Sequence, residues 1–325
     1  MAPLVELNGL VKEFHSPGLI AARRRSIRAV DGVSLGIGSD SIFGLVGESG
    51  CGKTSLARAL LYLDPPSAGE VRFDGIPLGR LSPGALKEMR SHMQIVFQDP
   101  NSALDPRLRV GQSLEEGLVN RRVPREERQR RVSALLKRVG LSPDQRSRYP
   151  HQFSSGQKQR LVIARALAVE PDFLILDEPV SNLDVSIQAQ IINLLLDLKR
   201  ELALTFLFIS HDLNLVAYLS DTIAVMHRGR IVEQADAEEL VARPLHPYTR
   251  RLFASLPGHG GLDETTPQRD ETTPAPGGPG CGFVPACPRR HADCLTRRPE
   301  LTDTGNGHLV ACPYADLSNS EEERP

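Results

Sequence analysis

The feature that most constrains this chain is a glycine-rich segment at residues 47–54, which reads Gly-Glu-Ser-Gly-Cys-Gly-Lys-Thr. A strand-like apolar pattern over 41–46 precedes it and a helical pattern over 55–61 follows it, which is the context that a phosphate-binding loop requires. Glycines let backbone N–H groups approach a phosphate closely, and the helix N-terminus adds partial positive charge. The segment therefore predicts that a nucleoside triphosphate binds at Gly47, Glu48, Ser49, Gly50, Cys51, Gly52, Lys53, Thr54 and Ser55.

Three residues of this loop have distinct expected roles, with ATP and Mg²⁺ as the expected ligands. Lys53 is expected to reach the β- and γ-phosphates, and the Thr54 hydroxyl is expected to bind Mg²⁺. Cys51 stands between two of the glycines. We interpret it as a small residue that the loop tolerates rather than as a redox centre.

The composition argues against several other classes of protein. The net charge is −1 and tryptophan is absent, so neither a basic surface nor an aromatic platform supports binding to nucleic acid. The apolar runs are far shorter than the roughly 20 residues of a membrane-spanning helix, and the first residues lack the pattern of a signal peptide. We therefore expect a cytoplasmic protein, in which five cysteines indicate metal binding or reactivity rather than structural disulfides.

Four regions follow one another along the chain. Strand-like apolar runs alternate with helical runs over residues 4–256, which predicts an α/β fold with a largely parallel sheet. Residues 257–280 are rich in Gly, Pro and Thr and are predicted to form a flexible linker. Residues 281–314 form a short Cys-rich segment, and residues 315–325 form an acidic tail that is predicted to be disordered.

The candidate catalytic residues end an apolar run that begins at Phe173. Asp177 and Glu178 follow this run, and a buried parallel strand delivers such residues to the carboxyl edge of its sheet. Asp177 is then placed to bind Mg²⁺, and Glu178 to orient or deprotonate the water that attacks the γ-phosphate. Taken alone, a strand that ends in an acidic turn explains the same pattern.

Further motifs in a fixed order strengthen this interpretation. Gln98 follows a strand-like run, Ser154-Ser155-Gly156-Gln157 opens a helical run, residues 181–184 follow the acidic pair, and His211 ends a second apolar run. With the phosphate-binding loop and the acidic pair, these six motifs stand in the order of the ATP-binding-cassette (ABC) ATPases, which the chain resembles over residues 4–256. The resemblance implies a P-loop NTPase fold, with a mixed-sheet core and a helical subdomain that carries the signature motif.

The resemblance also implies roles for residues outside the loop. Gln98 would bind Mg²⁺ and sense the attacking water, and His211 would contact the γ-phosphate. Phe14 would stack on the adenine, although a core phenylalanine explains that position equally well. In a dimer of two such subunits, each ATP is enclosed by the signature of the opposite subunit, which here comprises Ser154, Gly156 and Gln157.

A narrower resemblance rests on Tyr149-Pro150-His151, residues 184–190 and residues 244–250 (Pro-Leu-His-Pro-Tyr-Thr-Arg). These segments look like those of the ATP-binding subunits of oligopeptide and dipeptide importers, and more like the second such subunit than the first. The resemblance implies an ATP hydrolase that energises peptide import. Its implied partners are a second ABC ATPase subunit, two transmembrane permease subunits and, indirectly, an extracytoplasmic peptide-binding protein.

This resemblance places the chain at the cytoplasmic face of the cell membrane, as a peripheral subunit with no nucleic-acid partner. Two alternatives stay open. The cargo of the importer could instead be nickel, glutathione or another small solute, because other chains select it. The alternative class is a soluble ABC ATPase of DNA repair or translation, which would normally carry two cassettes or basic insertions.

The Cys-rich segment has the spacing Cys-x5-Cys-x6-Cys-x17-Cys, at Cys281, Cys287, Cys294 and Cys312. Four thiolates in a segment with so little apolar surface suit a metal centre, which would stabilise the segment. The importer resemblance implies a 4Fe–4S cluster; Zn²⁺ is the first alternative, and free thiols or a disulfide are the others. His291 and His308 are interpreted as surface or loop histidines rather than ligands.

Overall fold

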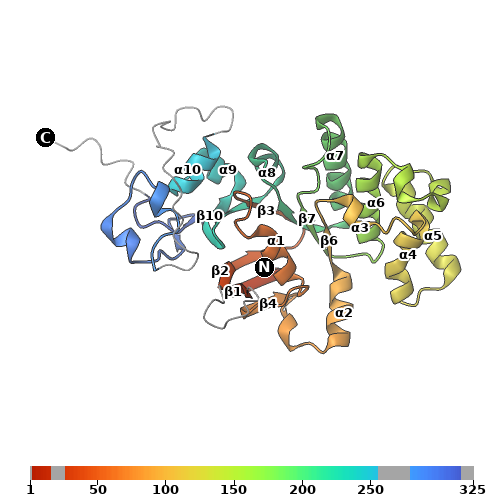
Figure 1. The fold of residues 1–325 in the computed structure, drawn as a ribbon, viewed down its shortest axis with the longest axis horizontal. Helices are drawn as coiled ribbons and strands as arrows, with labels where there is room; N and C mark the ends of the chain where they lie inside the picture. Colours follow the sequence, from red (N-terminus) through yellow and green to blue (C-terminus); the bar gives the residue numbers. More distant parts are fainter. Residues whose placement is uncertain (1, 16–25, 255–278, 316–325) are drawn as a thin grey trace. The chain divides into compact units, whose positions relative to one another are not determined.

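The computed structural model describes residues 2–15, 26–254 and 279–315 (Figure 1). Most of the predicted linker, 257–280, and of the predicted acidic tail, 315–325, lies outside these residues. The chain forms two compact units. Unit 1 comprises Met1–Ile37, Ile42–Gly79 and Ile209–Pro325, and unit 2 comprises Gly38–Ser41 and Arg80–Phe208.

An antiparallel sheet in unit 1 has the strand order β2-β1-β4-β5. Its strands are β1 (Val5–His15), β2 (Ser26–Ile37), β4 (Ala68–Phe73) and β5 (Ile76–Pro77). Val5 pairs with Ile37 on one side and with Phe73 on the other, and all three side chains are buried. Because side chains alternate along a strand, this register directs one face of the sheet towards the core.

A second sheet contributes the strands β11-β12-β10-β9-β3, in this order, to unit 1. They are β3 (Ile42–Val46), β9 (Thr222–His227), β10 (Arg230–Asp236), β11 (Thr302–Asp303) and β12 (Leu309–Val310). β3 is buried throughout and runs parallel to β9, whereas β9, β10, β12 and β11 pair antiparallel. The predicted apolar strand therefore leads into the glycine-rich loop.

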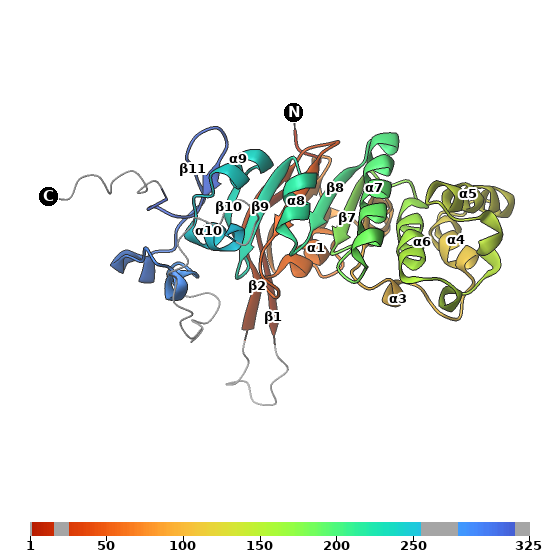
Figure 2. The same ribbon diagram turned by 90° about the horizontal axis from the view of Figure 1, so that it is seen from above.

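The helices of unit 1 pack against both of its sheets. They are α1 (Lys53–Leu60), α8 (Leu213–Leu219), α9 (Ala237–Ala242) and α10 (Pro247–Phe253), with the 3-10 turns η5 (Val284–Ala286) and η6 (Ala292–Leu295). α1 contacts β1 and β2, whereas α8 contacts β3 and α9 contacts β9. Figure 2 labels α8, α9 and β9 in a second view. A β-carbon at Gly44 would lie 2.4 Å from Val216 Cγ1, so a glycine in β3 is what allows α8 to pack this closely.

Unit 2 contains the strands β6 (Met93–Val96), β7 (Phe173–Asp177) and, except for its last residue, β8 (Thr205–Ile209), in the order β8-β7-β6. β6 and β7 are parallel. Its helices are α2 (Pro83–His92), α3 (Pro100–Ala103), α4 (Val110–Asn120), α5 (Arg125–Arg138), α6 (Ser155–Leu167) and α7 (Val185–Leu202). The 3-10 turns are η2 (Leu78–Arg80), which begins in unit 1, η3 (Pro143–Ser147) and η4 (Pro150–Gln152).

Three helices of unit 2 form the helical subdomain that was predicted. α4, α5 and α6 contact one another (Figure 1), and the predicted signature motif lies at the start of α6. Gly117 allows close packing in α4, because a β-carbon there would lie 2.6 Å from Val169 Cγ1. The prediction of an α/β fold with a mixed-sheet core and a helical subdomain is confirmed.

The Cys-rich segment is joined to the core sheet. β12 pairs with β10, so that Val310 lies opposite Glu233 and Leu309 lies opposite Gln234. β11 and β12 have two residues each, which is too short for an alternating pattern to predict them. Within the described residues, no helix combines the length and the apolar composition needed to cross a membrane.

Candidate active site

Two glycines of the loop occupy positions that no other residue fits. Gly47 has φ 154° and Gly52 has φ 114°. A β-carbon on Gly47 would lie 2.2 Å from the Met226 carbonyl oxygen, and one on Gly52 would lie 2.1 Å from the Ala29 carbonyl oxygen. The loop therefore packs directly against β9 and β2, and Gly52 is the N-cap of α1. This packing explains why the motif has glycine at both positions.

Lys53 occupies the first position of α1 and is buried. Its Nζ donates to the carbonyl oxygens of Gly47, at 2.7 Å, and of Glu48, at 3.1 Å. Among the other predicted loop residues, the exposed ones are Glu48, Ser49, Gly50 and Thr54. An ammonium group and the N–H groups of a helix N-terminus thus lie in one short segment, which suits the binding of an anion.

Cys51 is a buried structural residue of the loop. Burial raises the pKa of its thiol above the usual value. A thiol that stays protonated is a poor nucleophile, which supports the interpretation of Cys51 as a tolerated small residue. Its carbonyl oxygen accepts the Gly229 N–H at 2.7 Å, so the turn between β9 and β10 also holds the loop in place.

In unit 2, two predicted site residues form a hydrogen bond. Gln98 Nε2 donates to Glu178 Oε2 at 3.0 Å and to Ser181 Oγ at 3.4 Å. Glu178 directly follows β7, and Gln98 follows β6 by two positions. Because β6 and β7 are parallel neighbours, their carboxyl ends lie at the same edge of the sheet. The sequence predicted both residues, and the structure adds the contact between them.

Asp177 and Glu178 have different surroundings despite being adjacent. Asp177 ends β7 and is 4% exposed. Glu178 is half-buried and has φ 49°, in the left-handed region that non-glycine residues seldom adopt. Such a conformation costs about 1–3 kcal/mol and is typical of functional sites. The buried carboxylate of Asp177, at the end of a strand, suits a metal ligand. The backbone conformation of Glu178 directs its carboxylate to Gln98 instead.

The predicted signature residues form the N-terminus of α6. Ser154 is the N-cap: its Oγ accepts the Gln157 N–H at 3.3 Å, and Gln157 Oε1 accepts the Ser154 N–H at 3.1 Å. This reciprocal pair fixes the start of the helix. Gly156 is required by packing, because a β-carbon there would lie 2.6 Å from Ile187 Cγ2. Ser154 itself is exposed, so the helix start lies at the surface of unit 2.

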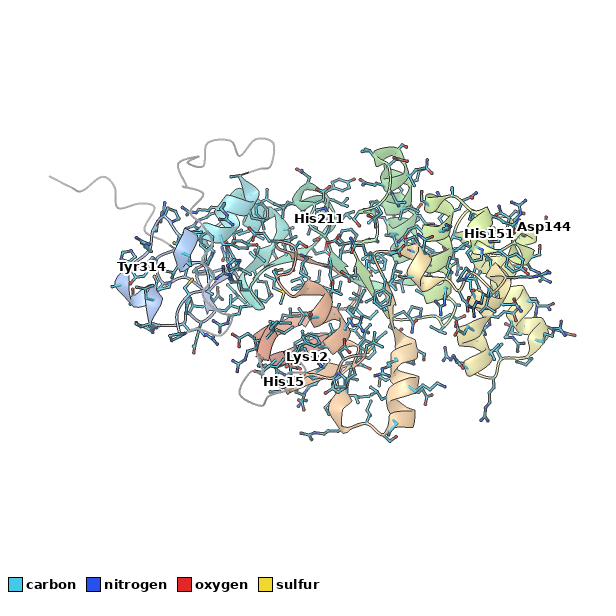
Figure 3. All side chains as sticks on the ribbon, in the orientation of Figure 1. Lys12, His15, Asp144, His151, His211 and Tyr314 are labelled. Atoms are coloured by element: carbon cyan, nitrogen blue, oxygen red, sulfur yellow. The ribbon has the colours of Figure 1, made fainter. Side chains whose placement is uncertain are left out.

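Phe14 and His211 are both exposed. Phe14 is 42% exposed on β1, with Lys12 Nζ 5.2 Å from its ring centroid, which excludes the alternative of a core phenylalanine. His211 stands directly before Asp212, the N-cap of α8 (Figure 3). The loop, Phe14 and His211 belong to unit 1, whereas Gln98, the acidic pair and the signature belong to unit 2.

Two side chains of α10 that contact the loop were not predicted. The Glu48 N–H donates to the Tyr248 hydroxyl at 3.0 Å, and Arg251 Nη2 lies 2.7 Å from Glu48 Oε1. Both residues belong to α10, far from Glu48 in the sequence. Tyr248 lies within the segment 244–250 that carried the importer resemblance, so that segment was the available signal.

The fully buried carboxylate of Glu233 on β10 accepts hydrogen bonds from two other segments of unit 1. Its Oε1 accepts the Leu245 N–H at 2.6 Å and lies 2.8 Å from His308 Nε2, and its Oε2 accepts the His246 N–H at 3.0 Å. Burial lowers the pKa of His308, but Glu233 and Glu239 outweigh this effect and raise the pKa above its usual value. His308 therefore lies in a loop, before β12, as one of the two predicted alternatives has it, but it is buried rather than at the surface.

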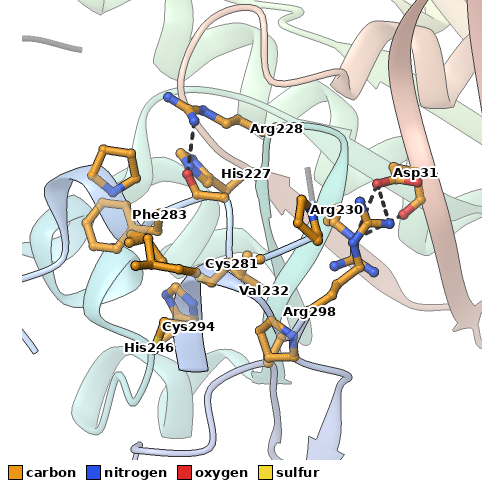
Figure 4. A pocket seen from close by; sticks show the side chains of 18 of the residues that line it. Asp31, His227, Arg228, Arg230, Val232, His246, Cys281, Phe283, Cys294 and Arg298 are labelled. Atoms are coloured by element: carbon orange, nitrogen blue, oxygen red, sulfur yellow. Dashed lines mark hydrogen bonds and ion pairs between the residues drawn. The ribbon is translucent and has the colours of Figure 1, made fainter. Parts of the chain in front are cut away.

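Two polar contacts anchor the Cys-rich segment to the core (Figure 4). Arg298 Nη1 lies 3.0 Å from Oδ2 of Asp31, a buried residue of β2. Arg228 Nη1 donates to the Gly282 carbonyl oxygen at 3.0 Å. A buried carboxylate needs such a partner, so Arg298 helps to hold the segment against β2 within unit 1.

The four cysteines of this segment line one cavity of about 250 Å³: Cys281, Cys287, Cys294 and Cys312. The Cys281 N–H donates to the Cys294 carbonyl oxygen at 2.8 Å. Burial raises the pKa of Cys281 and Cys287, and raises that of Cys312 to about 11. Among the described residues, no three His, Cys, Asp or Glu side chains form a group with the geometry of a single-ion site.

A glycine-rich loop between a parallel strand and a helix defines the chain as a P-loop NTPase. Comparison with known proteins gives the family. The model of the ABC transporter family matches residues 30–181. The model described as the C-terminal region of oligopeptide/dipeptide transporters matches residues 232–294.

Individual proteins agree with these matches. The dipeptide transport ATP-binding protein DppF of Escherichia coli is 40% identical over 327 residues, which cover 99% of this chain and 96% of that protein. The glutathione import ATP-binding protein GsiA of Pectobacterium atrosepticum is 44% identical over 311 residues, covering 95% of this chain and 48% of that protein. A solved dimeric structure of the ATP-binding cassette MJ0796 with ADP and Pi is 30% identical, with a TM-score of 0.63, and covers 72% of this chain and 98% of that one.

The chain therefore belongs to the ATP-binding proteins of ABC transporters, in the group that carries the oligopeptide/dipeptide transporter C-terminal region. The family and the fold class predicted from the sequence are confirmed. As an ABC ATPase, the chain binds ATP with Mg²⁺ and hydrolyses it to drive transport.

Proposed function

We propose that this chain is the ATP-hydrolysing subunit that energises import of oligopeptides or dipeptides through separate membrane subunits. The hydrogen bond from Gln98 to Glu178 is the observation that best supports ATP hydrolysis. It joins Gln98, which is expected to bind Mg²⁺ and sense the attacking water, to Glu178, the candidate base. Support for peptide cargo comes from the relationship, over nearly the whole chain, to a dipeptide transport ATP-binding protein. The match over residues 232–294 supports it further.

In this proposal the loop and three oxygen donors bind Mg²⁺-ATP. Residues 47–55 bind the triphosphate through their N–H groups, and Lys53 contacts the β- and γ-phosphates. Thr54, Gln98 and Asp177 hold Mg²⁺, whose hard character favours oxygen ligands. The bound Mg²⁺ would supply charge neutralisation at the phosphates.

Hydrolysis then depends on three further side chains. Glu178 accepts a proton from the attacking water while Gln98 holds the carboxylate in place. The water oxygen bonds to the γ-phosphorus, the bridging P–O bond breaks, and its electron pair leaves with ADP. His211 stabilises the charge on the γ-phosphate, and Phe14 stacks on the adenine.

The subunit acts as one half of a dimer with a second ABC ATPase subunit. Ser154, Gly156 and Gln157 at the start of α6 close over the ATP of that partner. The dimeric structure of a related cassette with ADP and Pi supports the formation of a dimer. The dimer lies at the cytoplasmic face of the membrane against two transmembrane permease subunits, and an extracytoplasmic peptide-binding protein delivers the cargo.

Uptake of labelled peptides tests this function directly. Cells that lack this chain should fail to accumulate a labelled dipeptide or oligopeptide, and the wild-type chain should restore uptake. The restored protein should sediment with membranes and be released by detergent. Normal peptide uptake in the deletion strain would contradict peptide cargo. Loss of nickel or glutathione uptake instead would support the alternative importer, and a chain that never sediments with membranes would support a soluble ABC ATPase.

The same proposal includes a 4Fe–4S cluster held by Cys281, Cys287, Cys294 and Cys312. The cavity that these four thiols line has room for a group larger than one ion, and cysteine thiolates are the ordinary ligands of such clusters. A bound cluster would cross-link a segment that has little apolar surface of its own, and would lower the raised pKa values of its thiols. Zn²⁺ bound by the same cysteines is the alternative.

Metal analysis separates these possibilities. Protein purified without oxygen is expected to contain about four iron and four sulfide per chain, with visible absorption that disappears after Cys287→Ser. Cys51→Ser is the matched control, because Cys51 lies in the phosphate-binding loop and should leave the metal content unchanged. Zinc without iron would replace the cluster with a structural zinc site. Absence of any metal from the wild-type protein would overturn the proposal of a metal centre.

A further inference from the structure

The phosphate-binding loop accepts support from Tyr248, a side chain that is completely buried. The Glu48 N–H donates to the hydroxyl of Tyr248, which is 0% exposed, at 3.0 Å. Glu48 is the second residue of the loop, so Tyr248 holds the point at which the chain leaves β3 and begins to curve. An N–H in this position stabilises the loop only while the buried hydroxyl stays in place.

The ring of Tyr248 is held in turn by residues of two other segments. Its centroid lies 4.2 Å from that of His227 in β9 and 5.5 Å from that of Phe283 in the Cys-rich segment. Phe283 is 3% exposed and meets the His227 ring edge-on at 5.7 Å. The three rings therefore form one aromatic cluster (Figure 4 shows His227 and Phe283), and Phe283 is its only member from the Cys-rich segment.

Arg251 makes a second contact between α10 and the loop. Arg251 Nη2 lies 2.7 Å from Glu48 Oε1, and the Arg251 guanidinium stands 5.2 Å from the Phe283 ring centroid. Both charged side chains are partly exposed, so this ion pair stabilises the loop less than the buried hydrogen bond does. Tyr248 and Arg251 nonetheless connect the same two features, Glu48 in the loop and Phe283 in the Cys-rich segment.

Phe283 is close in the sequence to one of the four cysteines. It lies two residues after Cys281, whose N–H donates to the Cys294 carbonyl oxygen at 2.8 Å. Arg228 fixes the intervening residue by donating to the Gly282 carbonyl oxygen at 3.0 Å. The place of Phe283 in the aromatic cluster therefore depends on how the Cys-rich segment is seated.

We propose that Tyr248 is a positioning residue for the phosphate-binding loop, and that the Cys-rich segment sets the affinity of the loop for ATP through Phe283. The inference rests on the proposed role of residues 47–55 in binding the triphosphate. A loop that is already held in its binding conformation loses less conformational freedom when ATP binds, so its affinity is higher. If the contacts of Phe283 or Tyr248 are lost, a smaller fraction of chains has the loop in its ATP-binding conformation, and the affinity for ATP falls in proportion.

Tyr248→Phe is the first test, because it removes one oxygen atom and leaves the aromatic cluster filled. Loss of a single hydrogen bond predicts an increase of about threefold to tenfold in the dissociation constant for Mg²⁺-ATP. The KM for ATP should rise in parallel, with kcat at saturating ATP unchanged. Tyr218→Phe is the matched control, since Tyr218 is 80% exposed on α8 and should leave both constants at the wild-type values.

A structural role alone predicts a different result. If Tyr248→Phe merely reduced the amount of folded protein, kcat per chain would fall while KM and the dissociation constant stayed the same. That outcome would overturn the positioning role. An unchanged dissociation constant in folded Tyr248→Phe protein would overturn it as well.

Phe283→Leu tests the connection to the Cys-rich segment. This variant keeps an apolar side chain and removes the ring that contacts Tyr248, so the dissociation constant for Mg²⁺-ATP should again rise. The double variant with Tyr248→Phe should show a smaller increase than the product of the two single increases, because both changes act through one path. Wild-type affinity in Phe283→Leu, or full additivity in the double variant, would contradict the connection. Failure of the wild-type chain to bind ATP would instead refute the proposed nucleotide site.

Discussion

Replacing Glu178 with glutamine is expected to lower ATP turnover by about a hundredfold to ten-thousandfold, which is the usual contribution of a general base. The amide cannot accept the proton of the attacking water, but its oxygen can still accept the hydrogen bond from Gln98. The dissociation constant for Mg²⁺-ATP should therefore stay close to the wild-type value, and ATP should accumulate in a closed dimer with the partner subunit. Single-turnover hydrolysis and equilibrium binding of labelled ATP measure the two effects separately.

Glu170→Gln provides a matched control for this variant. Glu170 also belongs to unit 2 and also has a positive φ, at 56°, but it pairs with Arg131 at the surface. The same chemical change at a similar backbone conformation should leave turnover within about twofold of the wild type, because exposed ion pairs contribute little. Turnover near the wild-type rate in Glu178→Gln would mean that another group accepts the proton.

Lys53→Ala is expected to weaken ATP binding by about a hundredfold or more. The ammonium group should form charge-assisted hydrogen bonds to two phosphates, and each such bond is worth about 1.5–3 kcal/mol. Alanine also leaves the Gly47 and Glu48 carbonyl oxygens without the donor that now holds them. Isothermal titration of the purified variant with Mg²⁺-ATP, at protein concentrations that detect weak binding, measures the loss.

Lys199→Ala is the control for the loss of a lysine. Its Nζ also donates to a backbone carbonyl, that of Asp40, at 2.7 Å, but it lies on α7 in unit 2. This variant should bind ATP as the wild type does, and both variants should be folded by circular dichroism. Wild-type affinity in Lys53→Ala would remove the phosphate role of this lysine and weaken the interpretation of the whole loop.

Local patterns in the sequence were enough to predict the parts of the site that lie within short segments. The loop depends on glycines whose positions are fixed by neighbouring backbone, and Gly47 and Gly52 have the conformations that the motif demands. Gln98 and Glu178 could be proposed because each follows a strand-like run. Their hydrogen bond could not be predicted, since it requires the pairing of β6 with β7.

Contacts between segments that are distant in the sequence could not be predicted from local patterns. Tyr248 stands 200 positions from Glu48, and no periodicity indicates that α10 contacts the loop. The burial of the loop residue His308 was not predicted for the same reason, because its partner Glu233 lies 75 positions away on β10. Phe14 was ambiguous from the sequence alone, and its exposure on β1 decides against a core position. Its stacking on adenine stays a prediction.

Release of inorganic phosphate is the measurement that tests the central claim most directly. The wild-type chain, assembled with its partner subunits and supplied with Mg²⁺ and ATP, is expected to release phosphate continuously and to stop when Mg²⁺ is chelated. The Lys53→Ala and Glu178→Gln assemblies should release it at the background rate. Phosphate release from the wild-type assembly that does not exceed the Lys53→Ala background would contradict the account of this chain as the ATP-hydrolysing subunit.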